Sequence, residues 1–177
     1  MKPVPHPTPH PAPAISLRRT TPEDLPRMFE LQADPASNAM AGTKPRTREA
    51  FFATWDKIFA NPRVNGFVIE MPAEGGAGRE LVGSIACFQA SEVPGEPEID
   101  CVGYWIARSH WGKGIASAAL AEFLKLEPRR PLHATADKNN AASRKILERC
   151  GFRLTGYRTG EETDRYLPCE LADFVLV

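Results

Sequence analysis

The chain has 177 residues, of which 42% are hydrophobic and 25% charged, the proportions of an average globular protein, and this excludes wholesale disorder. Its 22 Lys and Arg residues equal its 22 Asp and Glu residues, and this zero net charge argues against a dedicated nucleic-acid or membrane-surface binder. The length favours one domain, and no apolar run approaches the roughly 18 residues of a membrane-spanning helix.

Prolines stand at every second position between Pro3 and Pro13. Alternate prolines remove backbone donors and fix φ, which excludes a helix or a central strand. We therefore expect a disordered, Pro-rich tail over residues 1–14 and a single domain over residues 15–177. His6 and His10 lack Cys or carboxylate partners nearby in the sequence, so a solvated tail is favoured there over a metal site.

The cysteines are far apart and form no C-x-x-C pair, which leaves zinc and redox chemistry without a motif. The first residues also lack the apolar segment of a secretory signal. We expect reduced thiols in a cytoplasmic protein that holds no metal. The residues concerned are Cys87, Cys101, Cys150 and Cys169.

The first part of the domain reads as a strand followed by two helices. Residues 15–18 alternate like a short strand. Thr21 is a candidate N-cap with Pro22 at the first helical position. A second helix is predicted from about Thr47, with one apolar face, and it ends at residues 61–62 (Asn-Pro).

The remaining pattern alternates between strands and helices. Strands are predicted over 66–71, 80–88, 98–107, 132–136, 152–157 and 165–177, and helices from 115 and over 140–150. The order β-α-α-β-β-β-α-β-α-β-β predicts a mixed α/β domain built on one sheet.

The junction Trp-Gly-Lys-Gly-Ile-Ala at residues 111–116 joins a strand to a helix. Small residues let an anion approach the free N–H groups at the positive end of a helix, so the segment predicts a pyrophosphate site. A plain tight connection is the alternative. The segment has neither a Walker pattern nor G-x-G-x-x-G, because Ser117 occupies the third glycine position.

A second segment, N-A-A-S-R-K-I-L-E-R-C-G-F at residues 140–152, follows after a helix and a strand. The pair W-G-K-G-I-A and N-x-x-S…G-F resembles the GNAT N-acetyltransferase superfamily, and most closely its branch of ribosomal-protein N-terminal acetyltransferases. I-S-L-R-R at 15–19, T-P-E-D-L at 21–25 and G-Y-W-I at 103–106 add to this resemblance. It implies a single central, mostly antiparallel sheet with splayed fourth and fifth strands and flanking helices.

The resemblance implies acetyl-CoA as cosubstrate, with its pyrophosphate in the glycine loop and its pantetheine arm beside the fourth strand. Asn140 matches the Asn that contacts the arm in the family, and an N-cap is the alternative on residue type alone. The cofactor-binding residues implied are Ile106, Ala107, Trp111, Gly112, Lys113, Gly114, Ile115, Ala116 and Asn140.

Acetyl transfer requires an amine that has lost a proton, and the departing thiolate leaves better when it is protonated. Many family members use a Tyr on the last helix, but here that position is Leu147. Ser143, which matches the Ser of the resembling branch, is our candidate proton donor to the thiolate. Its structural alternative is a helix Ser that hydrogen-bonds to the preceding turn.

Asp100, near the start of the fourth strand, is our candidate base, because some relatives carry a catalytic carboxylate there. A solvated strand end or a salt bridge is the structural alternative. In close relatives a Glu stands two residues before the Gly of G-Y-W, and here that residue is Cys101. Catalysis by positioning alone therefore stays open, with the amine deprotonated in solution. Glu161 and Glu162 are candidates for binding a cationic substrate, and an exposed acidic turn is the favoured alternative.

These features predict an acetyl-CoA-dependent N-acetyltransferase that acts by direct attack of a primary amine in a ternary complex. The acceptor is a small molecule or a peptide such as a protein N-terminus, and no nucleic-acid or membrane partner is expected. A monomer or a homodimer both fit. The alternative function is a catalytically weak CoA-binding sensor or regulatory domain.

Overall fold

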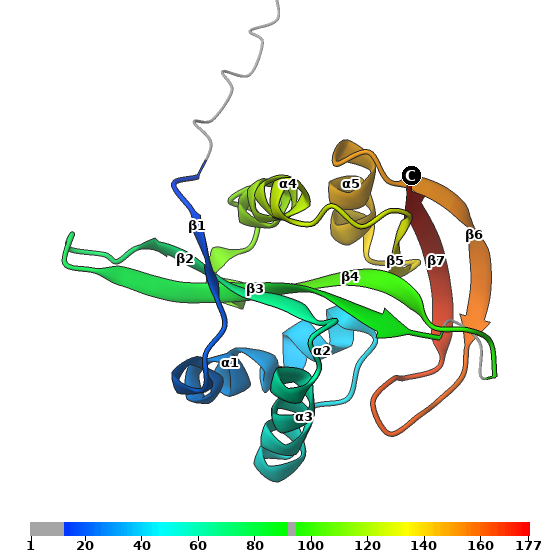
Figure 1. The fold of residues 1–177 in the computed structure, drawn as a ribbon, viewed down its shortest axis with the longest axis horizontal. Coiled ribbons are helices and arrows are strands. Elements are labelled where there is room, and N and C mark those ends of the chain that lie inside the picture. The colour runs from blue at the N-terminus through cyan, green and yellow to red at the C-terminus, as the bar shows by residue number, and fades with distance from the viewer. Residues whose placement is uncertain (1–12, 92–94) are drawn as a thin grey trace, which may run out of the picture.

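The computed structural model describes residues 13–91 and 95–177 (Figure 1). Most of the expected tail, residues 1–12, lies outside the described residues. The described chain forms a seven-stranded sheet in the order β1-β2-β3-β4-β5-β7-β6. Its strands are β1 (Ser16–Arg19), β2 (Asn65–Pro72), β3 (Arg79–Ala90), β4 (Ile99–Ile106), β5 (Leu132–Asp137), β6 (Arg153–Gly160) and β7 (Cys169–Leu176).

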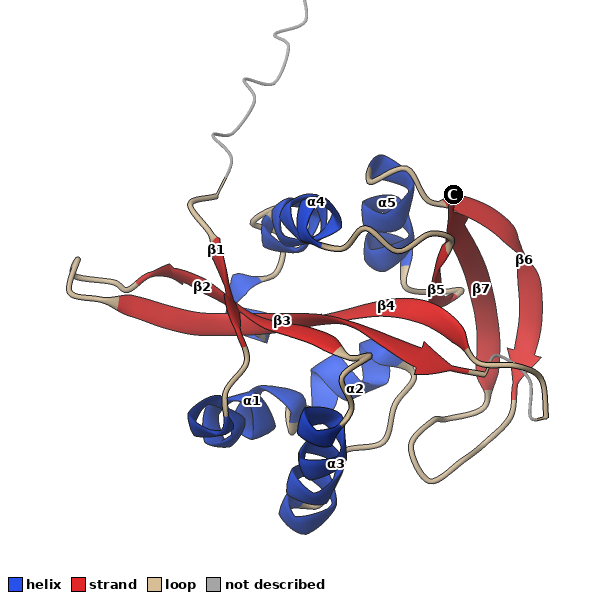
Figure 2. Ribbon diagram, in the orientation of Figure 1, coloured by secondary structure: helices blue, strands red, loops and turns tan. Residues whose placement is uncertain are grey.

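Helices cover both faces of this sheet (Figure 2). α1, α2 and α3 lie on one face, and α4 and α5 lie on the other (Figure 1). Every neighbouring strand pair is antiparallel except β4 with β5, which is parallel. The mixed α/β fold with one mostly antiparallel sheet is therefore confirmed. The helices are α1 (Leu25–Gln32), α2 (Pro35–Ala41), α3 (Arg48–Ala60), α4 (Ile115–Leu126) and α5 (Ala141–Arg149).

Each face of the sheet has its own apolar core. On one face α4 buries a single stripe against the strands, and Phe123 meets Phe67 edge to face, with ring centroids 5.8 Å apart. On the other face α3 buries Phe51 and Trp55 against α1 and Val68. These residues recur at helical spacing, which is why the sequence pattern located both helices.

Strands β4 and β5 diverge at the centre of the sheet. Among the described residues their pairing is limited to one register position, Cys101 opposite His133, whereas β3 pairs with β4 along eight positions. Beyond that point neither strand covers the other's facing edge. The expected splay of the fourth and fifth strands is present, and it opens a gap in the sheet.

Helix α2 has no counterpart among the elements predicted from the sequence. Asp34 caps this helix by accepting a hydrogen bond from the Ser37 N–H, Pro35 occupies its first position, and Gly42 ends it with φ +63°. These are standard start and stop signals, but the helix is seven residues long and mostly small or polar, so it carries no apolar period.

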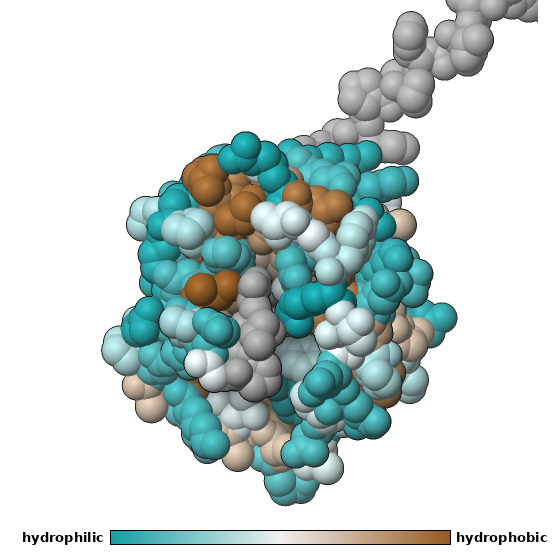
Figure 3. All heavy atoms as spheres, turned by 90° about the vertical axis from the view of Figure 1, so that its right-hand side faces the viewer, coloured by the Kyte–Doolittle hydropathy of each residue, from teal (hydrophilic) through white to brown (hydrophobic). Residues whose placement is uncertain are grey.

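The last strand begins at Cys169 rather than at residue 165, because the loop before it packs elsewhere. Residues 161–168 lie against the segment after α2, where Lys44 N–H donates to Arg165 C=O at 2.7 Å and Leu167 N–H donates to Gly42 C=O at 2.9 Å. The side of the molecule that carries β6 and β7 is largely hydrophilic, with apolar residues gathered toward one end (Figure 3). Within residues 13–91 and 95–177 no helix is long and apolar enough to cross a membrane.

Candidate active site

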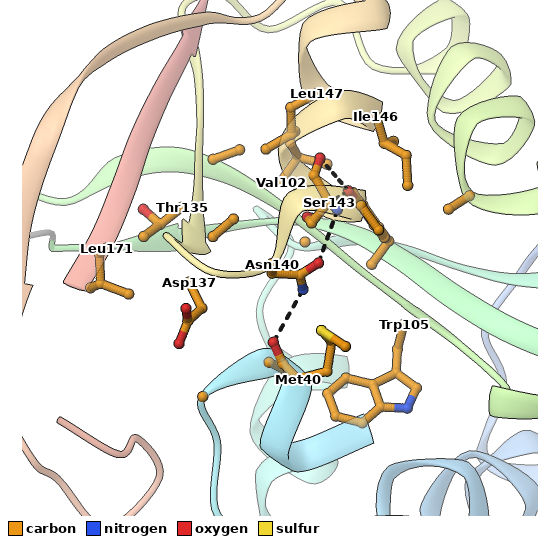
Figure 4. A pocket seen from close by; sticks show the side chains of 18 of the residues that line it. Met40, Val102, Trp105, Thr135, Asp137, Asn140, Ser143, Ile146, Leu147 and Leu171 are labelled. Carbon is orange, nitrogen blue, oxygen red and sulfur yellow. Dashed lines mark hydrogen bonds between the residues drawn. The ribbon is translucent and has the colours of Figure 1, made fainter. Parts of the chain in front are cut away.

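A cavity of about 1090 Å³ occupies the gap between β4 and β5. Side chains from both faces of the sheet line it. Met40 of α2 contributes from one face, and Ser143 and Ile146 of α5 contribute from the other. Figure 4 shows these residues around a common space, with Thr135 and Leu171 toward β5 and β7. The cavity therefore connects the two faces through the sheet, and two molecules that enter from opposite sides could meet inside it.

One end of the cavity is the glycine loop before α4. Gly112 and Gly114 have φ values of +73° and +74°, a backbone conformation that strongly favours glycine. Among residues 13–91 and 95–177 no side chain caps α4, and its first backbone hydrogen bond runs from Ala118 N–H to Gly114 C=O at 3.1 Å. Within that part of the chain the earlier N–H groups are free to bind an anion at the positive end of the helix.

The shape of this loop also fits a phosphate group. A Cβ added at Gly112 would meet nothing within 4 Å, so open space adjoins the backbone there. Five of the residues expected to bind the cofactor line the cavity, namely Trp111, Gly112, Gly114, Ile115 and Ala116. Lys113 is exposed and lies outside the lining, so any contribution from it comes through its backbone or from long-range charge.

Ile106 and Ala107, the two residues expected to contact the pantetheine arm, differ in the direction of their backbone groups. Ala107 is 2% exposed, and both its backbone groups are engaged, since its N–H donates to Val82 C=O and its C=O accepts from His110 N–H. We therefore withdraw Ala107 as a contact. Because strand residues alternate in direction, the backbone of Ile106 faces the opposite edge, toward the cavity. Its C=O accepts the Trp111 indole N–H at 2.9 Å.

Asn140 links the two helices that flank the gap. Its Oδ1 accepts a hydrogen bond from Ser143 N–H at 3.0 Å, which makes it the N-cap of α5. Its Nδ2 donates to Met40 C=O of α2 at 3.2 Å (Figure 4). The capping alternative considered from the sequence is thus realised. The second Nδ2 hydrogen remains available to a ligand in the cavity, which Asn140 also lines.

Ser143 lies one turn into α5 and faces the cavity. Its Oγ is 2.8 Å from the Oη of Tyr104, a residue of β4. Leu147, at the position of the tyrosine used by many relatives, is 1% exposed and contributes no proton donor. A tyrosine nevertheless reaches this region from a different element, and the sequence analysis did not identify it.

Asp100 lies outside the cavity lining, in a partly buried polar network at the start of β4. One carboxylate oxygen accepts from Arg129 Nη1 at 3.0 Å and also from the Gln89 amide. Arg129 in turn binds Glu127, which is 1% exposed. A carboxylate held by a guanidinium at a strand end has a structural role, so we withdraw Asp100 as the candidate base and adopt its salt-bridge alternative.

Other titratable groups do line the cavity. Asp137, the last residue of β5, projects into it, and its Oδ1 accepts Asn139 N–H at 2.7 Å (Figure 4). Glu161 lines it from the loop before β7, whereas Glu162 is outside the lining and pairs with Lys44 at 2.6 Å. The structure thus retains one of the two acidic residues considered for a cationic substrate.

Comparisons with known proteins agree with this geometry. The model of the acetyltransferase (GNAT) domain family matches residues 15–153. A search of curated proteins found no match to this chain.

Among solved structures, spermidine N-acetyltransferase from Vibrio cholerae, in complex with CoA and spermine, superposes with a TM-score of 0.73 at 17% identity over 92% of this chain and 94% of that one. RimJ from Mycobacterium smegmatis, in complex with CoA-disulfide, superposes with a TM-score of 0.71 at 23% identity over 94% of this chain and 83% of that one. Ribosomal-protein-alanine N-acetyltransferase from Brucella melitensis superposes with a TM-score of 0.70 at 21% identity over 92% of this chain and 99% of that one.

The family match covers well over half of the chain, and its residues carry the glycine loop, the parting strands and the last helix described above. The chain is therefore an acyltransferase that belongs to the GNAT acetyltransferase family.

Proposed function

We propose that this protein transfers the acetyl group of acetyl-CoA to a primary amine by direct attack in a ternary complex. The observation that carries this proposal is the uncapped N-terminus of α4, where two glycines of positive φ open into a cavity that crosses the sheet. Such a helix start binds a pyrophosphate through backbone N–H groups, so the site does not depend on an excess of basic residues, which this chain of zero net charge does not have.

Different residues along the cavity bind the pyrophosphate, guide the pantetheine arm and donate a proton. The N–H groups of residues 112–116 hold the pyrophosphate, and the cavity-facing edge of β4 around Ile106 guides the arm toward α5. Bound acetyl-CoA supplies an activated acyl group on a good leaving group. Ser143, which faces the cavity beyond this edge, gives a proton to the departing sulfur.

The acceptor enters from the face that carries α2. Two carboxylates, Asp137 and Glu161, line the cavity and would attract a cationic acceptor. The lining also holds the basic side chains of Lys145, Arg149 and Arg158, of which Arg158 is paired with Asp173. With Asp100 engaged elsewhere, positioning of an amine that has already lost its proton supplies most of the acceleration. Structural neighbours act on spermidine and on ribosomal proteins, and both classes present amines. Small polyamines and protein N-termini are accordingly the acceptor classes we propose.

The second candidate function is a CoA-binding sensor with weak catalysis. Leu147 favours it, because this buried side chain replaces the proton donor of many relatives.

An assay on wild-type protein separates the two functions. We would incubate it with acetyl-CoA and either spermine or a peptide that begins with alanine, and follow CoA release and the mass of the acceptor. Stoichiometric acetylation of either amine supports the enzyme. CoA binding without acetylation across a wider panel of primary amines would identify the sensor, and failure to bind CoA would contradict both.

A further inference from the structure

Two hydroxyl groups from distant parts of the chain meet beside the cavity. Tyr104 Oη, on β4, and Ser143 Oγ, on α5, are 2.8 Å apart across 39 positions of sequence, and both residues line the cavity. Strand alternation places Tyr104 on the α5 face, while its neighbour Trp105 donates its indole N–H to Leu31 C=O of α1 on the other face. The proposed function gives Ser143 a role and leaves Tyr104 without one.

The chemistry of the two groups gives the hydrogen bond a direction. A phenol is the better donor, and an aliphatic hydroxyl oxygen is the better acceptor. Burial raises the pKa of Tyr104 to about 12, so this residue keeps its proton at neutral pH. Its other near acceptor, the Ser143 carbonyl oxygen, lies at 3.4 Å, the outer limit of a hydrogen bond. Donation from Tyr104 to Ser143 Oγ is therefore the direction that this chemistry favours.

This direction leaves the proton of Ser143 available. A serine within a helix usually donates to the carbonyl one turn earlier. Within the described residues the hydrogen-bond partner of Ser143 Oγ is Tyr104, and the Ser143 N–H is taken by the Asn140 cap. The cap and the phenol together fix the backbone and the oxygen of Ser143 and direct its hydrogen away from both of them.

We propose that Tyr104 is a positioning residue for acetyl transfer, which aims the Ser143 proton at the sulfur of CoA. The inference rests on the proposed function. The amine nitrogen forms a bond to the carbonyl carbon, and the C–S bond breaks with its electron pair on sulfur. Sulfur takes the Ser143 proton, and Ser143 regains a proton from water, to which the nitrogen releases one. Tyr104 keeps its proton throughout.

The pKa of the thiol in bound CoA tests this arrangement without an acceptor. A hydroxyl that donates to the thiolate lowers this pKa, and loss of the donor raises it. We would titrate the ultraviolet absorbance of the thiolate in the binary complex and subtract the same titration with desulfo-CoA, which removes the signals of adenine, tyrosines and cysteines. The variants are Tyr104→Phe, Ser143→Ala and the double variant.

We expect Tyr104→Phe to raise the pKa of the bound thiol by about 0.5 to 1, a threefold to tenfold loss in its ionisation constant. Ser143→Ala should raise it at least as much, and the double variant should match Ser143→Ala, because the phenol acts through the serine. The matched control is Tyr157→Phe, which removes a phenol outside the cavity that accepts from Arg144 Nη2 at 3.1 Å. This control variant should leave the pKa of the bound thiol unchanged.

A kinetic measurement supplements this titration. With a productive amine, Tyr104→Phe should lower kcat about tenfold and leave the KM for acetyl-CoA within about twofold, a pattern that a merely structural role would not give.

Each outcome decides between the claims. If wild-type protein does not bind CoA, the proposed function fails, and this inference fails with it. The inference is overturned, and the proposed function stands, if CoA binds and Ser143→Ala shifts the pKa of the bound thiol while Tyr104→Phe does not. The same holds if the pKa shifts of the two single variants add in the double variant.

Should Tyr104→Phe fail to fold, 3-fluorotyrosine labelling of the wild type provides the test, since it strengthens the phenol as a donor. It should lower the pKa of the bound thiol, and Ser143→Ala should abolish that change. An unchanged thiol pKa, or a shift that persists in Ser143→Ala, would overturn the inference.

Discussion

Strand β4 carries polar side chains at two places, and their surroundings differ in kind. At its start, Asp100 is held by Arg129, which also binds Glu127, so each charge there has a partner. Further along, Tyr104 meets Ser143 at the edge of a cavity, and both groups are neutral hydroxyls. The first group joins the start of β4 to the segment after α4 through ion pairs, and the second lines the cavity.

This difference shows why residue type alone could not choose between the two places. A carboxylate near the expected position is the usual choice for a base, but a guanidinium neighbour occupies its lone pairs and holds it in place. A tyrosine that is central to the site can be overlooked when it belongs to a strand rather than to the expected helix. The neighbouring elements decide which polar group is available for chemistry.

The largest effect should come from the paired charges. Glu127→Gln removes a carboxylate that accepts from Arg129 Nη2 at 2.7 Å and from Asn65 Nδ2 at 2.9 Å. Loss of this buried charge leaves Arg129 poorly compensated, and we expect the free energy of unfolding at pH 7 to fall by about 2 to 3 kcal/mol. Urea unfolding measures this loss. Glu122→Gln, which breaks an exposed pair with Lys125, is the control and should change little.

The same substitution should alter the response to acid. Arg129 holds the pKa of Glu127 at about 2, below its ordinary 4.5. Because the folded pKa is depressed, the stabilisation is complete above about pH 5 and is lost as pH falls through 4.5 toward 2. The difference between wild type and Glu127→Gln should shrink over that window. A constant difference from pH 7 to pH 3 would refute the assigned cause.

The next effect should appear in catalysis at the other place on β4. Ser143→Ala should lower kcat by about tenfold to a hundredfold and change the KM for acetyl-CoA by less than about threefold, because the hydroxyl acts on the departing sulfur. The Asn140 cap binds the backbone of this residue and survives the change. Steady-state kinetics checks the split, with Ser84→Ala on β3 as the control. A rise in KM at constant kcat would return Ser143 to a binding role.

The smallest effect should follow Asp100→Asn. The amide still accepts from Gln89 and Arg129, and Arg129 retains Glu127, so we expect a stability loss below about 1 kcal/mol and a kcat within twofold of wild type. Side-by-side kinetics of this variant and Ser143→Ala gives the comparison. A drop in kcat larger than tenfold for Asp100→Asn would restore Asp100 as a candidate base.

The sequence predicted those parts of the molecule that depend on local pattern. The stripe of α4 and the alternation of β3 and β4 located the sheet and its packing. The position of the glycine loop could be predicted because Gly112 and Gly114 mark a backbone of positive φ between a strand and a helix. Its binding of a pyrophosphate stays a prediction.

Contacts between distant elements were beyond such reasoning. The meeting of Tyr104 with Ser143 depends on which face of β4 receives α5, and alternation fixes only that Tyr104 and Trp105 point in opposite directions. The engagement of Asp100 by Arg129 depends on the path of the chain after α4. Helix α2 was not predicted from the sequence, because its seven residues have no apolar period and only its caps mark it as a helix.

The central claim, that the loop before α4 holds the pyrophosphate of CoA, has one direct test. Gly112 and Gly76 have φ values of +73° and +79°, and a Cβ at either meets nothing within 4 Å, but Gly76 lies in the hairpin between β2 and β3, outside the cavity. Asp tolerates this conformation better than most residues and adds a negative charge. Both Gly→Asp variants should therefore bear similar strain.

Calorimetric titration with CoA compares the two variants. We predict that Gly112→Asp weakens CoA binding by about a hundredfold or more, since the carboxylate enters the space of the phosphates, and that Gly76→Asp binds CoA like the wild type. Equal affinity for CoA in wild type, Gly112→Asp and Gly76→Asp would contradict the account.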